Sequence, residues 1–181
     1  MTDSGDTSGF RAQLLLAVGL IALAVFSRVL PHPANFTPVA AVAIFGGAVL
    51  PRRWAVTLPL VAMIISDLII GLHPLIAYTW GSFALIALGS SWFMRKVNVR
   101  SAIGASLSAS VLFFLVTNFG VWAEGRLYDR TLPGLIQCYY NALPFFRGTL
   151  MGDLVFVGLL FGAYALAKNL SVFLRPKTLT D

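Results

Sequence analysis

The sequence is poor in the residues that carry chemistry in many soluble enzymes. It has one cysteine in 181 residues, Cys138, so neither a disulfide within the chain nor an all-cysteine metal site can form. The zinc-protease, serine-hydrolase and P-loop signatures do not occur in it. We therefore predict that the protein is not an enzyme, has no cofactor and no resident metal, and does not itself hydrolyse ATP.

Charge is scarce as well. Only 11% of the residues are charged, 13 of them Lys or Arg and 7 Asp or Glu, while 58% are hydrophobic. Soluble domains are about 25% charged, so the composition predicts an integral membrane protein surrounded by lipid. The net charge of +6 does not indicate a nucleic-acid partner, because the basic residues stand at the ends of apolar blocks and form no stripe.

The apolar blocks predict an all-α bundle of six transmembrane helices. They cover residues 12–30, 36–50, 54–72, 75–94, 101–123 and 146–168. The second block is short for a crossing of about 20 residues, and prolines bound it, so we expect it to be tilted, broken or partly re-entrant. Residues 1–10 are expected to be a disordered tail, 11–172 the transmembrane domain, and 173–181 a cytoplasmic tail.

The distribution of Lys and Arg predicts the orientation. With both termini in the cytoplasm, nine of the 13 basic residues lie on the inner side of the membrane. The positive-inside rule favours this arrangement, and an even number of spans requires both termini on one side. We expect a multi-pass protein of the bacterial inner membrane.

Three polar residues interrupt the apolar blocks: Asp67 in "IISDLII", Asn118 in "LVTNFGV" and Asp153 in "LMGDLVF". Counting about 1.5 Å per residue from the helix ends places all three in the outer third of the membrane. An ionisable side chain there is costly and usually faces a cavity or a partner. A pocket open to the outside explains the three together. The alternative is internal pairing of Asp67 or Asp153 with Arg28 or Arg147, which would only hold the bundle together.

The outer connections are richer in polar and aromatic residues than the inner ones. The longest is expected to be "EGRLYDRTLPGLIQCYYNALPFF", residues 124–146, and to close over the pocket as a lid. Gly125 and the Pro133–Gly134 pair permit such a motion. An aromatic belt at the membrane surface is the alternative for most of the tyrosines and phenylalanines. The further residues expected to contact a substrate are Asn35, Tyr78, Trp80, Trp122, Tyr139 and Tyr140.

Two side chains raise the question of a metal. His32 and His73 each stand beside a proline in an outer loop, and nothing in the sequence fixes their separation. Cys138 is either an ordinary buried thiol or a soft ligand to a metal carried by the substrate, and His32 is a second candidate contact to such a metal.

Small residues recur at four-residue spacing, which lets helices approach closely in lipid. Gly148 with Gly152 and Gly158 with Gly162 form two such pairs in the last block, and Ala43 with Gly47 does so in the second. Internal packing is one interpretation. A docking face for a partner subunit is the other.

The strings "RVLPHPANFTPVAAVAIFGGA", "TNFGVW" and "GLIQCYYNALPFFRGTLMGDLVF" resemble a family of uncharacterised small bacterial integral membrane proteins. More distantly, the chain resembles the S-components of energy-coupling-factor vitamin transporters. That resemblance implies six helices, both termini inside and an outward-facing ligand site. It also implies that Ala40, Ala43 and Gly47 dock a transmembrane coupling subunit that works with ATPases. Cobalamin-binding members place a cysteine thiolate on cobalt, which here would be Cys138.

These features together predict a membrane protein of S-component type that captures a small nutrient or vitamin, cobalamin among the candidates, from the outer side for uptake. The alternative is an accessory subunit of a larger membrane complex, which would explain the small-residue faces without a ligand. A weaker alternative is a lipid-modifying enzyme with Asp67 and Asp153 as a catalytic dyad.

Overall fold

The structure, a computed structural model, describes residues 4–94 and 97–173. Residues 1–3 of the expected N-terminal tail and 174–181 of the expected C-terminal tail lie outside the described residues. The described part of the chain contains six helices and no strand, which confirms the all-helical class. The helices are α1 (Ser4–Val29), α2 (Val39–Val49), α3 (Arg52–Ile70), α4 (Ile76–Phe93), α5 (Val99–Glu124) and α6 (Leu132–Phe173).

Each of the six apolar blocks coincides with a helix, and the helix ends differ from the blocks in instructive ways. α1 begins at Ser4 and so includes most of the segment expected to be a tail. α5 begins with a capping box, in which Asn98 and Ser101 each accept a hydrogen bond from the other's backbone N–H. It ends at Glu124, and the next residue, Gly125, has a positive φ of 65° that suits glycine at a helix C-terminus.

Three of the helices are long and apolar enough to cross a membrane: Gly9–Val29 in α1, Val99–Glu124 in α5, and Leu132–Asn169 in α6. Much of the apolar side-chain surface of these helices faces outward, as lipid contact requires. Leu15 of α1 is 74% exposed, and Leu159 of α6 is 61% exposed. Val39–Val49 and Trp54–Ile70 are shorter apolar helices.

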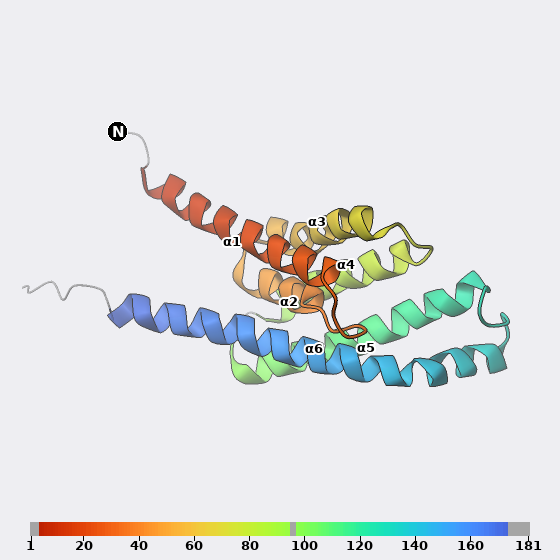
Figure 1. Cartoon of the computed structure of the whole chain (residues 1–181). Coiled ribbons are helices and arrows are strands. Elements are labelled where there is room, and N and C mark those ends of the chain that lie inside the picture. The colour runs from red at the N-terminus through yellow and green to blue at the C-terminus, as the bar shows by residue number, and fades with distance from the viewer. Residues whose placement is uncertain (1–3, 95–96, 174–181) are drawn as a thin grey trace, which may run out of the picture.

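α2 is the centre of the bundle. It contacts all the other helices, and Val39 to Gly47 are buried without interruption. Figure 1 shows α2 between a layer containing α1, α3 and α4 and a layer containing α5 and α6. With 11 residues it is roughly 16 Å long, about half the apolar thickness of a bilayer. The prediction that this segment departs from an ordinary span agrees with its length.

The chain passes back and forth along one axis. In Figure 1 the first turn of α1 and the last turn of α6 lie at the same end of the bundle, on the left. The connections α3–α4 and α5–α6 lie at the opposite end, while the α1–α2 connection stops part of the way along. The α1–α2 connection, residues 30–38, therefore ends short of the other two connections along the bundle axis, and its first residues, 30–35, are exposed.

The prediction of a long outer loop over residues 124–146 is wrong, because α6 starts at Leu132 and runs for 42 residues. Pro133 occupies the first turn, where its missing N–H costs nothing, and Pro144 is accommodated inside the helix. The two glycines assigned to lid motion have local roles. A side chain at Gly134 would collide with the carbonyl oxygen of Asp129, and one at Gly125 would meet Arg130.

The small residues of α2 serve internal packing. Ala40 and Ala43 are 4% and 0% exposed, and a Cβ on Gly47 would lie 2.6 Å from the carbonyl oxygen of Ala87 in α4. The docking face that we expected at Ala40, Ala43 and Gly47 is thus covered by the chain's own helices. Gly148 and Gly152 in α6 instead admit the α1–α2 connection, because side chains there would meet the backbone of Ala34 and Phe36.

Candidate functional site

Asp67 is held by an internal cluster. It lies near the end of α3, is fully buried, and forms an ion pair with the Nη2 of Arg28 from α1. Trp80 of α4 donates its Nε1–H to Asp67 Oδ2 at 2.8 Å, and His73 Nε2 lies 3.8 Å from the same oxygen. The internal pairing considered as an alternative for Asp67 is therefore present. The cluster ties α1, α3 and α4 together.

A polar cavity of about 270 Å³ lies beside this cluster. All six helices or their connections contribute to its wall, and more than half of the lining residues are polar. The lining consists of Arg28, His32, Asn35, Thr37, Ala40, Ile70, Phe83, Phe113, Thr149 and Asp153. The α1–α2 connection contributes His32, Asn35 and Thr37 to this wall, and Asn35 has a positive φ of 58°.

Asp153 is the acidic residue in the lining of the polar cavity. It is 2% exposed, and Ser110 of α5 donates its hydroxyl to Asp153 Oδ2 at 2.6 Å. The Ser110 oxygen is also 3.0 Å from the Ser106 carbonyl oxygen, so its single hydroxyl proton is shared between the two acceptors. Among the described residues no Lys, Arg or His forms an ion pair with Asp153. A carboxyl group in such surroundings is costly unless a ligand or a proton neutralises it.

Arg28 connects the cluster to the cavity. Its guanidinium group has five N–H donors, and Asp67 accepts from Nη2. The Arg28 side chain is 18% exposed and lines the polar cavity. Its Nε is buried and has no hydrogen-bond partner within the described part of the chain. Arg28 is thus both the counter-ion of Asp67 and a source of donors at the cavity.

A second cavity, of about 320 Å³, adjoins the first, and we call it the side cavity. The two share Asn35, Phe113 and Thr149 in their walls. Asn118 lines the side cavity, where its Nδ2 donates to the Phe114 carbonyl oxygen of its own helix at 2.8 Å. Asn118 and Asp153 therefore face neighbouring cavities, whereas Asp67 lines neither.

The aromatic residues expected to stack on a ligand make contacts within the protein instead. Tyr78 packs on Gly120 and edge-on against Phe119. The Trp122 indole donates to the carbonyl oxygens of Asp129 and Thr131, and Tyr139 donates to the Leu115 carbonyl oxygen at 2.7 Å. Tyr140 is 72% exposed. None of these, nor Trp80, is in the lining of the polar or the side cavity.

The two candidate contacts to a substrate metal, Cys138 and His32, each form a hydrogen bond with a backbone carbonyl oxygen. Cys138 is 2% exposed, and its thiol donates to the Asn118 carbonyl oxygen at 3.4 Å. His32 Nδ1 lies 2.7 Å from the Leu30 carbonyl oxygen, so it carries the proton of that hydrogen bond. His32 lines the polar cavity and Cys138 does not, so the structure does not bring the pair together there. The described residues contain no group of three His, Cys, Asp or Glu side chains that could hold a metal.

Sequence reasoning missed Ser110 and Thr149. Thr149 lines both cavities, and Ser110 holds Asp153. A signal for Thr149 was present, because it precedes Asp153 by four residues and therefore shares its helical face. Ser110 had no comparable signal, because only the packing of α5 on α6 brings it to Asp153.

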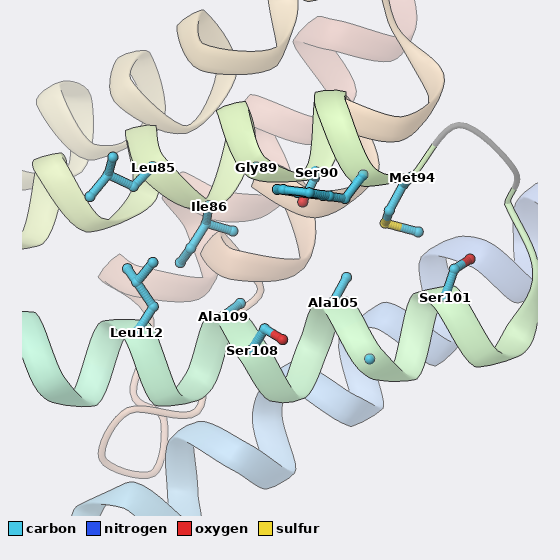
Figure 2. A pocket seen from close by; sticks show the side chains of 12 residues that line it. Leu85, Ile86, Gly89, Ser90, Met94, Ser101, Ala105, Ser108, Ala109 and Leu112 are labelled. Carbon is cyan, nitrogen blue, oxygen red and sulfur yellow. The ribbon is translucent and has the colours of Figure 1, made fainter.

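Two further grooves are mostly apolar. One, of about 440 Å³, lies between the end of α4 and the beginning of α5, and Figure 2 shows Leu85, Ile86 and Leu112 projecting into it beside small residues such as Ala105. Its lining has no titratable residue, so it offers packing rather than polar recognition. The other, of about 760 Å³, lies between α5 and α6 and contains Gly158 and Gly162, which have open space beside them.

Comparison with known proteins places the chain in a family. Residues 8–176 match the family of unknown function DUF6580, and the chain belongs to that family. No curated protein and no solved structure matches the chain.

Proposed function

We propose that this member of the DUF6580 family is an integral membrane protein that captures a small polar solute from the outer side for uptake, with the polar cavity as its binding site. In this proposal the chain passes through the bilayer six times, with α2 as a half-length segment. Both termini then face the cytoplasm, as the distribution of Lys and Arg favours.

One observation carries the proposal. Asp153 and Arg28 both line a cavity inside an apolar bundle, and Asp153 has a hydroxyl rather than a cation as its partner. A charged group retained at such a place without structural pairing is typical of a substrate or ion site in membrane proteins. The same reasoning does not apply to Asp67, whose partners are present in the chain.

The size of the cavity limits the solute. Pockets for drug-sized ligands occupy about 300–1,000 Å³, and the polar cavity has about 270 Å³. A compact solute of a few heavy atoms fits it. A corrinoid is many times larger, and Cys138 does not line the cavity, so cobalamin has no support from this geometry.

Native mass spectrometry of the protein purified gently from its own membrane tests the proposal. We expect a small adduct that is lost in Asn35→Gly, because this change removes an amide from both cavity walls and keeps a residue that tolerates the positive φ. Asn141→Ala is the matched control, since Asn141 is exposed and bonded to Tyr128. The absence of any adduct, or an adduct that both variants retain, would contradict the proposal.

A second candidate is the accessory-subunit role, and the groove at Gly158 and Gly162 favours it. Both glycines have open space beside them, so another helix has room to approach α6 closely. The same spectrum separates the two proposals. Co-purifying subunits that Gly162→Leu removes, together with an adduct-free mass, would support the accessory role.

A further inference from the structure

The charges around the polar cavity specify the chemistry of its ligand, and this inference rests on the proposed function. Arg28 and Asp153 are the Arg and Asp residues in the lining. Asp67 neutralises Arg28 in the internal cluster, so with His73 neutral the three residues Arg28, Asp67 and Asp153 together carry one negative charge when Asp153 is ionised. His32 also lines the cavity, but it is exposed and bonded to Leu30.

Asp153 accepts one hydrogen bond, from Ser110, on one of its two carboxylate oxygens. A carboxylate has room for about four such bonds, so it can also accept from a donor in the cavity. A cationic donor is favoured over a neutral one, because it cancels the excess charge in surroundings of low dielectric. An ammonium group satisfies both requirements.

Arg28 requires a hydrogen-bond acceptor from the ligand, whereas Asp153 requires a donor. The Arg28 guanidinium group has more donors than the one bond that Asp67 accepts, and the partly exposed Arg28 side chain lines the cavity. A ligand group near Arg28 must therefore be a hydrogen-bond acceptor. A carboxylate acceptor would restore the excess negative charge and compete with Asp67, so a neutral acceptor such as a hydroxyl or carbonyl oxygen fits better.

We propose that the ligand is a compact primary amine with a neutral hydrogen-bond acceptor, held by its ammonium group on Asp153 and by its acceptor on Arg28. The hydroxyl-bearing Thr37 and Thr149 also line the cavity, and Phe83 and Phe113 form the aromatic part of its wall. A ligand of net charge +1 brings the total charge of Arg28, Asp67, Asp153 and the ligand to zero.

The first experiment varies the ligand and leaves the protein unchanged, so it does not depend on how a variant folds. Isothermal titration of the full chain in lipid nanodiscs compares ethanolamine with ethane-1,2-diol, which lacks the cation, and with glycolate, which carries a negative charge. We expect the latter two to bind about thirtyfold or more weakly, the usual penalty for leaving a buried charge unpaired. Ethylamine, which lacks the acceptor, should bind roughly fivefold more weakly.

The second experiment varies the protein. Asp153→Asn removes the charge and keeps an acceptor for Ser110, so ethanolamine affinity should fall by about thirtyfold or more. Asp129→Asn removes an exposed carboxylate outside both cavities and should leave the affinity unchanged.

Equal binding of ethanolamine and ethane-1,2-diol, or full affinity in Asp153→Asn, would overturn the ligand assignment. If none of these amines binds while the native adduct persists and depends on Asn35, the ligand assignment fails and the proposed function stands. If the native adduct is absent as well, the proposed function itself fails.

Discussion

Asp67 and Asp153 are the same residue type in similar apolar sequence, and the bundle buries both almost completely. Asp67 meets a guanidinium group and an indole N–H, with an imidazole nearby, from other parts of the chain. Asp153 meets one hydroxyl and a cavity. A carboxylate in an apolar helix has a free-energy cost of burial wherever it stands. Its contacts in the folded protein decide whether it stabilises the fold or forms part of a binding site.

The largest effect is expected at the internal cluster. Asp67→Asn leaves Arg28 largely buried without its counter-ion, and breaking such a pair costs about 3–5 kcal/mol. The free energy of unfolding in mixed micelles, from titration with a denaturing detergent, measures this change. A loss below about 1 kcal/mol would remove the distinction between the two aspartates.

Trp80→Phe sharpens the same point with a smaller change. The substitution keeps an aromatic ring and removes the 2.8 Å hydrogen bond to Asp67, which as a bond to a charged group contributes about 1.5–3 kcal/mol. The same detergent titration measures it. Trp92→Phe is the control, because Trp92 is 59% exposed and has no role in the cluster. Equal losses in the two variants would mean that the Trp80 indole N–H is not a specific partner of Asp67.

Gly148→Ala tests how the cavity is covered. Its Cβ would collide with the Ala34 carbonyl oxygen and push the connection carrying Asn35 away from α6, at a cost of about 1–3 kcal/mol. Gly158→Ala, ten residues further along the same helix, meets open space and should leave stability unchanged or raise it by up to about 1 kcal/mol. Thermal unfolding of the two variants side by side checks this, and a similar loss in both would count against the packing explanation.

The smallest effect on stability is expected at Asp153. Asp153→Asn removes a charge that has no counter-ion in the described chain and keeps an acceptor for Ser110, so the free energy of unfolding should rise by about 1 kcal/mol. Its effect on ligand binding should nevertheless be large. A loss of several kcal/mol in the ligand-free protein would place Asp153 in the same structural class as Asp67.

Much of the fold follows from the sequence. Long apolar blocks separated by prolines and charges identify the helices, since a helix is the simplest way to satisfy backbone groups in an apolar medium. The error at residues 124–146 arose because Pro133, Gly134 and Pro144 were interpreted as loop residues. In fact Pro133 occupies a first turn, Gly134 permits a close approach to Asp129, and the bundle tolerates Pro144.

The site was less predictable. Asn118 and Asp153 were identified because polar residues are rare in apolar sequence, and Asn35 because the outer connections are rich in polar residues. The structure places the three around two adjoining cavities. The separation of Asp67 from these cavities depends on how α1 and α4 pack against α3, which no local pattern encodes. The contacts of Tyr78 and Tyr139 with α5, and of Trp122 with the α5–α6 connection, could not be predicted for the same reason.

The short central helix also has a consequence for how the protein is made. An apolar segment of 11 residues is too short to be retained by lipid alone, so α2 depends on neighbours that are already in place. α1 precedes it in synthesis, but α3 and α4, which cover much of its surface, emerge from the ribosome later. During translation α2 is therefore without most of its covering until α3 and α4 have been made, and the first four helices are expected to enter the membrane as a group rather than one at a time.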